Sequence, residues 1–167
     1  LTVFLMGIVW RVAETAARRM ITDRLQGIAQ LTADSIPYFL EAGQNMIQQI
    51  AQDQRLVRGL PTEIDGYLQE HLRAVPFFTQ FYVLNQQGES IAGYPQSDYN
   101  RASALVAEQM GIRLALGGVP FQTYSAPPQS NEDAAQVSFI AALQDGQGTT
   151  QRVLIGRTSL SDNPMTQ

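Results

Sequence analysis

Apolar residues recur at intervals of three and four along the first third of the chain. Gln, Asp and Arg separate them, which is the pattern of an amphipathic helix with one buried stripe. The stripe comprises Ile21, Leu25, Ile28, Leu31, Ile36, Phe39, Met46, Ile47 and Ile50. One long helix is therefore predicted from about residue 10 to about residue 55. Pro37 lies inside it and is expected to kink or divide it near Ser35, because proline removes a backbone donor.

A second helix is predicted from Pro61, and Pro76 is expected to end it. Beyond it the pattern changes to short apolar strands separated by polar turns, with one helix between them. The predicted strands are 78–85, 90–95, 120–125, 135–143 and 152–160, and the helix lies within 98–118. Gly88 is expected to supply the positive φ of the first hairpin turn. The residues of that last helix predicted to be buried are Leu105, Val106, Met110, Leu114 and Leu116.

Composition limits the classes of chemistry. The 167 residues fit one domain with a helical extension, and the absence of cysteine excludes disulfides and thiolate chemistry. The formal charge is −4 and lysine is absent, which argues against a nucleic-acid-binding face. His71 is the single histidine, so neither a catalytic triad nor a zinc site can be assembled. A calcium site at residues 131–133 is a weak alternative. We therefore expect no enzymatic activity, cofactor or metal.

The first ten residues, LTVFLMGIVW, carry no charge. They amount to half of the roughly 20 apolar residues that cross a bilayer. One interpretation is the outgoing end of a transmembrane helix, with Trp10 at the interface and Arg11 outside the hydrocarbon. The other is the buried first helix of a soluble domain. The first is favoured, so a membrane-anchored protein is predicted.

Three features together resemble the Cache family of extracytoplasmic sensor domains, which are similar to PAS domains. They are the long amphipathic helix, the hairpin FYVLNQQGESIAGYP and the closing VLIGRTSLSDNP. The resemblance implies an α+β fold with a five-stranded antiparallel sheet. The long helix would pack on one face, and a ligand cavity beneath the intermediate helix would occupy the other.

The ending LSDNPMTQ resembles the segment that leads from the membrane-distal unit of a two-unit Cache receptor into its second unit. The implied organisation is a membrane-proximal segment at 1–10, the long helix at 11–58, the sensor domain at 59–160 and the start of a linker at 161–167. The Tyr, Arg and Trp-Tyr pattern of amino-acid-binding members is missing, since Trp10 is the only tryptophan. An amino-acid ligand is therefore not implied.

Four tyrosines in or beside the predicted sheet are candidate ligand contacts, because a phenol combines apolar area with a hydrogen-bonding tip. They are Tyr82, Tyr94, Tyr99 and Tyr124. The alternative for each is ordinary sheet packing.

Two arginines and a serine complete the candidate set. Arg113 and Arg157 are flanked by apolar residues, so each guanidinium needs an anion. That anion would be a ligand carboxylate or an internal acid such as Asp98 or Asp145; exposure of the guanidinium to solvent is the other alternative. Ser138 should lie on the face opposite Phe139 if the strand alternates.

These features predict an extracytoplasmic sensor domain of a bacterial transmembrane receptor that binds an unidentified small molecule. A histidine kinase, a diguanylate cyclase and a chemoreceptor remain open as the receptor type. A homodimer through the N-terminal helix is expected, because Ala13 and Ala17 allow close helix approach. The alternative is a ligand-free spacer and dimerisation module of such a receptor.

Overall fold

The computed structural model describes residues 36–74, 76–95, 106–126 and 135–159. The chain divides into two compact units, Leu1–Tyr38 and Phe39–Gln167, and the fold below is that of the second. The predicted membrane segment, the linker and most of the long helix lie outside the described residues. Within the described ranges, no helix combines the length and apolar character needed to span a bilayer.

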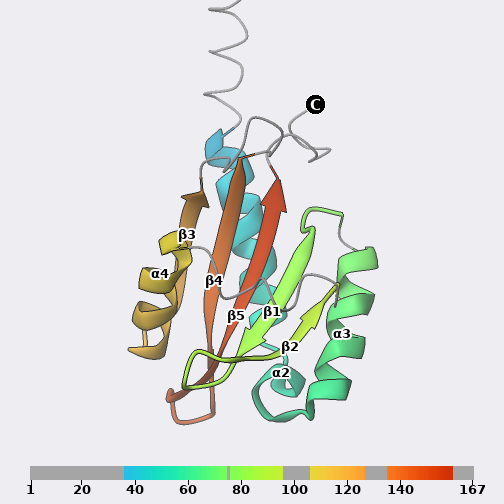
Figure 1. Cartoon of the computed structure of the whole chain (residues 1–167), viewed down its shortest axis with the longest axis vertical. Helices are drawn as coiled ribbons and strands as arrows, with labels where there is room; N and C mark the ends of the chain where they lie inside the picture. Colours follow the sequence, from blue (N-terminus) through green and yellow to red (C-terminus); the bar gives the residue numbers. More distant parts are fainter. Residues whose placement is uncertain (1–35, 75, 96–105, 127–134, 160–167) are drawn as a thin grey trace, which may run out of the picture. The chain divides into compact units, whose positions relative to one another are not determined.

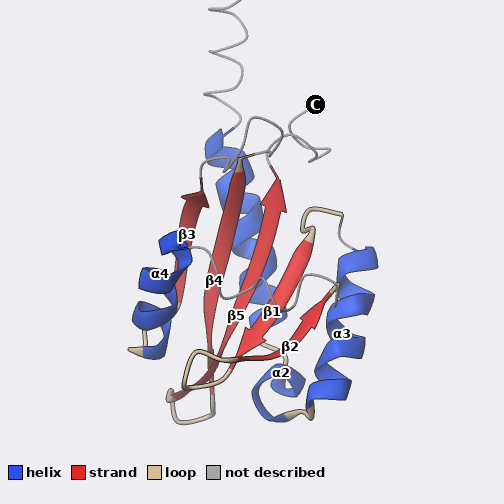
Figure 2. Cartoon of the chain, in the orientation of Figure 1, coloured by secondary structure: helices blue, strands red, loops and turns tan. Residues whose placement is uncertain are grey.

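Five antiparallel strands form one sheet in the order β2-β1-β5-β4-β3 (Figure 2). They are β1 (Gln80–Leu84), β2 (Ser90–Tyr94), β3 (Phe121–Ala126), β4 (Gln136–Gln144) and β5 (Thr150–Ser159). The sheet and the helix packed on it confirm the α+β fold class predicted from the sequence. β5, the last of the described strands, lies at the centre between β1 and β4.

The strand register divides the apolar residues between two faces. Phe139 pairs with Gly156 and Gly156 with Phe81, whereas Ile140 pairs with Ile155 and Ile155 with Tyr82. The first row belongs to a large hydrophobic cluster shared with helix residues 39–51, α2 and α3. The second row belongs to a smaller cluster shared with α4. Each face of the sheet therefore has its own apolar layer.

Residues 36–51 are helical, and the part from Phe39 onward packs on the larger cluster, behind the strands in Figure 1. The helix ends at residue 51, which corrects the predicted end near 55 and the single helix predicted over 11–58. A separate short helix, α2 (Gln54–Arg58), follows. Asp53 caps it, because its side chain accepts a hydrogen bond from the Arg55 amide. An N-cap residue starts a new helix and so interrupts the preceding one.

The Asp53 cap predicts an acid-sensitive contribution to stability. The hydrogen bond from the Arg55 side chain lowers the pKa of Asp53 from 3.8 to about 2. Because the folded pKa is the lower one, the contribution is present above pH 4 and is lost as the pH falls towards 2. We expect a loss of about 1 kcal/mol for this partly exposed pair.

Urea unfolding of wild type and Asp53→Asn at pH 4 and pH 2 measures this loss. The variant keeps a capping side chain without the charge, so the difference between the two proteins should shrink at the lower pH. A difference independent of pH would contradict the assignment.

Phenylalanines form the centre of the larger cluster. The Phe139 ring lies 5.8 Å from both Phe77 and Phe78 and 6.3 Å from Phe39, measured between centroids. Gly43 of the helix lies so close that a methyl group on it would overlap the Phe139 ring. Glycine thus sets the distance between helix and sheet.

Alanine at Gly43 is therefore expected to lower the free energy of unfolding by about 1–3 kcal/mol through overpacking. Gly66 is the matched control: it lies in the exposed part of α3, and a methyl group there would meet no atom within 4 Å. Gly66→Ala should raise stability by about 0.5–1 kcal/mol, because glycine has the greater conformational freedom when unfolded. Thermal unfolding of both variants checks the pair, and equal effects would contradict the close approach.

Helix α3 (Pro61–Ala74) begins at the predicted proline and lies beside the edge strand β2 (Figure 1). The Gly93 amide of that strand donates to Asp65 Oδ1 over 2.9 Å. Gln69 Nε2 donates to the Tyr94 hydroxyl over 3.3 Å. Side chains of α3 thus satisfy groups on the outer edge of the sheet, which would otherwise be open to pairing.

The tight turns of the β1–β2 and β4–β5 hairpins are closed by the same kind of hydrogen bonding. Asn85 Oδ1 accepts from the amides of Gln87 and Glu89, and Gly88 has φ +79°, as predicted. In the turn before β5, Asp145 Oδ1 likewise accepts from the amides of Gln147 and Thr149, and Gly148 has the positive φ of +79°. These side chains close the turns by bonding to the backbone two and four residues ahead.

Helix α4 (Val106–Leu116) covers the face opposite the N-terminal helix and contacts β3, β4 and β5. The prediction of its buried face was wrong at Met110 and Leu114, whereas Leu116 is partly buried against the smaller cluster, in line with the prediction. Leu105 and the side chain of Val106 lie outside what the structure describes. Met110 and Leu114 are exposed, whereas Glu108, Gly111 and Ala115 are buried. The helix approaches the sheet closely, so it turns small residues inward and leaves long apolar side chains outside.

Candidate functional site

A row of polar side chains crosses the sheet on the α4 face. Tyr124 of β3 pairs with Ser138 of β4, Ser138 with Arg157 of β5, and Arg157 with Gln80 of β1. Because residues opposite one another in neighbouring strands share a face, these four side chains lie beneath or beside α4. Ser138 and Arg157 are both buried.

The charge of Arg157 is matched by Glu108 of α4. Arg157 Nε donates to Glu108 Oε1 over 2.7 Å and Nη2 donates to Oε2 over 2.6 Å. Ser138 Oγ also donates to Glu108 Oε1. Both charged side chains are almost fully buried, at 6% and 2% exposure. This bidentate pair is the electrostatic centre of the α4 face.

Aromatic and amide groups surround the pair. The Arg157 guanidinium lies 5.1 Å from the centroid of the Tyr82 ring, within cation–π range. Gln80 Oε1 accepts from the Tyr82 hydroxyl over 3.2 Å and from Arg157 Nη1 over 3.4 Å. On the edge strand, the Tyr124 hydroxyl donates to Gln122 Oε1 over 3.0 Å. Among the described residues, the buried Gln122 Nε2 has no hydrogen-bond partner.

Gly111 allows α4 to lie close to the sheet. A methyl group on Gly111 would overlap the Tyr124 ring and crowd Ile140. The backbone of α4 therefore lies directly on β3 and β4, with Ala115 buried one turn further along. Glu108 precedes Gly111 by three residues, so it lies on the same side of the helix and reaches the sheet.

The structure brings together four of the seven residues predicted from the sequence: Tyr82, Tyr124, Ser138 and Arg157. Ser138 lies opposite Phe139 as expected. Among the described acids, the partner of Arg157 is Glu108, which was not one of the two acids predicted from the sequence. Asp145 instead accepts hydrogen bonds in the turn before β5, and Asp98 lies outside the described residues.

Two of the other predicted residues lie elsewhere, and one is not described. Tyr94 packs against the larger cluster on the opposite face, where it pairs with Phe81. Arg113 is exposed on α4, so its guanidinium is not held on an apolar face as predicted. Tyr99 lies outside the described residues.

Sequence reasoning missed Glu108, Gln80 and Gln122. The available signal for Glu108 was its spacing of three and seven residues from Gly111 and Ala115, which forms a stripe of small residues on α4. Gln80 and Gln122 alternate with Tyr82 and Tyr124, so each glutamine shares a face with a tyrosine.

The groups of the α4 face are suited to binding. A guanidinium, hydroxyls and carboxamides can hold an anionic or polar molecule. His71 lies in α3, where its ring contacts Tyr67 and Nδ1 lies 3.1 Å from the Tyr67 carbonyl oxygen. Across the described ranges, no group of three or more His, Asp or Glu side chains could hold a metal ion. The alternative calcium site at 131–133 lies outside those ranges.

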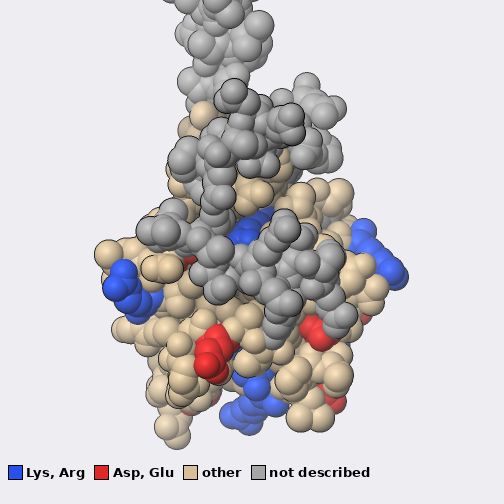
Figure 3. All heavy atoms as spheres, viewed as in Figure 1, with Lys and Arg blue, Asp and Glu red and all other residues tan. Residues whose placement is uncertain are grey.

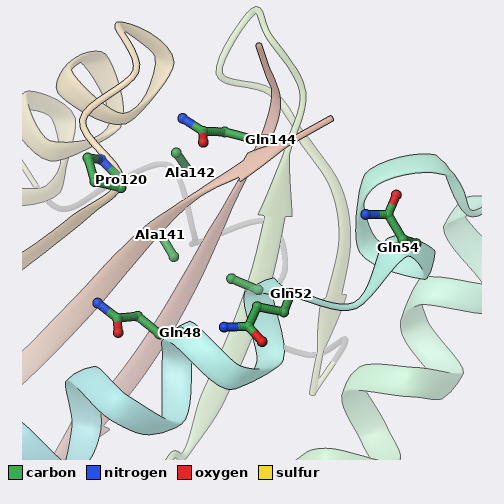
Figure 4. Close-up of a pocket in the computed structure, with 8 residues that line it drawn as sticks. Gln48, Gln52, Gln54, Pro120, Ala141, Ala142 and Gln144 are labelled. Atoms are coloured by element: carbon green, nitrogen blue, oxygen red, sulfur yellow. The ribbon is translucent and has the colours of Figure 1, made fainter. Parts of the chain in front are cut away.

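A pocket of about 440 Å³ lies at another place, where the end of the N-terminal helix meets β4 and the residue before β3 (Figure 4). Its walls carry Gln48, Gln52, Gln54 and Gln144, and Ala51, Pro120, Ala141 and Ala142 supply its apolar surface. It contains no charged group, so it offers only neutral hydrogen bonds. None of the residues predicted for the site lines it.

The described charged residues visible in Figure 3 do not form one broad patch. The described acidic and basic side chains there lie in separate small groups among uncharged ones.

No protein-family model matches the chain, and no curated protein does. Several solved structures match the chain. The sensor domain of the Vibrio cholerae histidine kinase DctB has a TM-score of 0.64 at 17% identity, over 86% of this chain and 57% of that one. The ligand-binding domain of the Pseudomonas aeruginosa chemoreceptor PctC, in complex with GABA, has a TM-score of 0.61 at 15% identity, over 83% and 61%.

A third neighbour is the ligand-binding domain of the Pseudomonas fluorescens chemoreceptor CtaA in complex with L-serine, with a TM-score of 0.55 at 18% identity, over 86% of this chain and 61% of that one. The chain has a Cache-type, PAS-like fold. This confirms the fold that the resemblance implied. The chain spans about three-fifths of the length of these three structures. At such low identity, the likeness to Cache-type structures is one of fold.

Proposed function

We propose that the chain is an extracytoplasmic sensor domain that binds a small organic molecule on the α4 face of its sheet. The observation that carries the proposal is the polar row beneath α4, centred on buried Arg157. It lies within a fold shared with sensor domains of histidine kinases and chemoreceptors. Two of those neighbours hold GABA and L-serine, so the fold can accommodate ligands of that size.

The proposed ligand contacts are Tyr82, Tyr124, Ser138 and Arg157, joined by Gln122, whose buried amide nitrogen has no partner among the described residues. Tyr99 stays a prediction. The domain acts by binding, not by catalysis. It belongs to a membrane-anchored bacterial receptor that forms a homodimer through its N-terminal helix. The proposed organisation is a membrane-proximal segment at 1–10, a helical region at 11–58 that is divided at Asp53, the sensor domain at 59–160 and a linker from 161.

Thermal unfolding of the purified protein against GABA, the proteinogenic amino acids and other small carboxylic acids tests the proposal. We expect at least one compound to raise Tm by about 2 °C or more, because a ligand that binds only the folded state stabilises it. Native mass spectrometry of the untreated protein detects a ligand that co-purifies.

Two tyrosines on opposite faces provide the matched controls. Tyr124→Phe removes a hydroxyl from the proposed site and should weaken the Tm shift, whereas Tyr94→Phe removes one from the other face and should preserve it. Equal shifts in both variants would place the ligand elsewhere, with the glutamine-lined pocket as the next candidate.

The alternative function is a ligand-free spacer and dimerisation module. The observation in its favour is that Glu108 already neutralises Arg157. A spacer predicts no Tm shift with any compound and no co-purified molecule.

A further inference from the structure

The Glu108–Arg157 pair occupies an unusual position for a structural ion pair. It joins α4 to the central strand β5, and both charges are withdrawn from water. A buried pair of this kind adds little net stability compared with apolar side chains of the same size, because desolvation offsets the attraction. The need for a stable core therefore does not explain why the pair is present.

Among residues 108–116, few other side chains attach α4 to the sheet. Ala115 is buried, Ile112 and Leu116 are partly buried, and Gly111 has no side chain. Met110 and Leu114 are exposed at 52% and 41%. Of the inward groups of α4, Glu108 makes the strongest directed contact with the sheet.

The geometry of the pair is that of a bound carboxylate. Two parallel hydrogen bonds run from the guanidinium to the two oxygens, and Ser138 donates a third to Oε1. A free carboxylate placed on Arg157 would make the same contacts. Glu108 therefore stands where the carboxylate of a ligand would bind.

We infer that Glu108 is an exchangeable latch: a ligand that carries a carboxylate takes its place on Arg157 and Ser138 and thereby releases α4 from the sheet. This inference rests on the proposed function and names both the ligand class and the element that moves. A tethered carboxylate competes at high effective concentration, so the ligand must make additional contacts to displace it. The ligand shifts α4 only to the extent that it binds the released arrangement more tightly.

Glu108→Ala tests the exchange. The change removes a group with the shape of acetate, so acetate should refill the site. We expect acetate to raise the Tm of the variant by about 3 °C or more beyond equal concentrations of acetamide or sodium chloride. Asp53→Ala, which removes the acid of an exposed arginine pair, should show no such preference for acetate.

Hydrogen exchange distinguishes a latch from a purely structural pair. In Glu108→Ala, the amides of residues 106–116 should exchange at least about tenfold faster relative to β4 than in wild type. Acetate should raise Tm without restoring their protection, because free acetate is not connected to the helix. A structural pair predicts that acetate restores both.

Three results would overturn the inference: acetate and acetamide acting equally, unchanged exchange of α4 in the variant, or restored protection with acetate. If Glu108→Ala does not fold in plain buffer, recovery of its circular dichroism signal by acetate but not by acetamide supports the exchange. Absence of recovery refutes it.

The proposed function is tested separately, and it fails if the wild-type protein binds no compound. A wild type that binds only uncharged compounds would reject the latch and keep the sensor.

Discussion

Replacing Glu108 by alanine should lower the free energy of unfolding by about 3–5 kcal/mol, one of the two largest effects expected in this domain. The reason is that Arg157 remains buried, at 5% exposure, without the carboxylate that accepts two of its hydrogen bonds. Denaturant unfolding followed by circular dichroism measures the change, with the slope checked for a two-state transition.

The double variant Glu108→Leu with Arg157→Met is the control. Replacing both members of a buried pair by apolar side chains is often neutral, so this variant should recover most of the lost stability. A double variant as unstable as the single one would mean that the pair itself, and not the stranded charge, stabilises the fold. A single variant within about 1 kcal/mol of wild type would mean that Arg157 reaches water, against its burial.

Phe139→Ala should lower the free energy of unfolding by a similar amount, about 3–5 kcal/mol, because it leaves a cavity at the centre of the aromatic cluster. Phe139 is fully buried and its ring neighbours Phe39, Phe77 and Phe78. Phe121 is the matched control: it stacks on Phe139 from the edge strand but is only partly buried, so Phe121→Ala should cost less.

Phe139→Ala also tests whether a loss of stability affects ligand binding. Its ring lies on the face opposite Ser138, so ligand-induced Tm shifts should persist in the folded variant. Their disappearance would place the binding site on the N-terminal helix side. Equal destabilisation by the two phenylalanine variants would contradict the central position of Phe139.

Much of the sheet was predictable because its signals are local. Alternating strands, Asn85 with Gly88, and Pro61 at the start of α3 each determine structure within a few residues. The boundary near Asp53 was missed because the apolar stripe continues at Leu56, which hid the cap between two helices.

The candidate site was predictable only in part, because it depends on contacts distant in sequence. Arg157 and Ser138 stood out as polar residues within apolar strands. Glu108 did not, since a glutamate on a helix usually lies in water, and its partner is 49 residues away. Tyr94 resembled Tyr82 as a phenol on a strand, but its pairing with Phe81 places it on the other face.

The central position of β5 affects how the domain is made. β1–β2 and β3–β4 are hairpins of neighbouring strands, yet they share no strand pairing until residues 150–159 lie between them. A growing polypeptide therefore cannot complete this sheet until residues 150–159 have been synthesised, and such long-range pairing slows folding. Arg157 arrives with that strand, so the polar row beneath α4 forms only once β5 is in place.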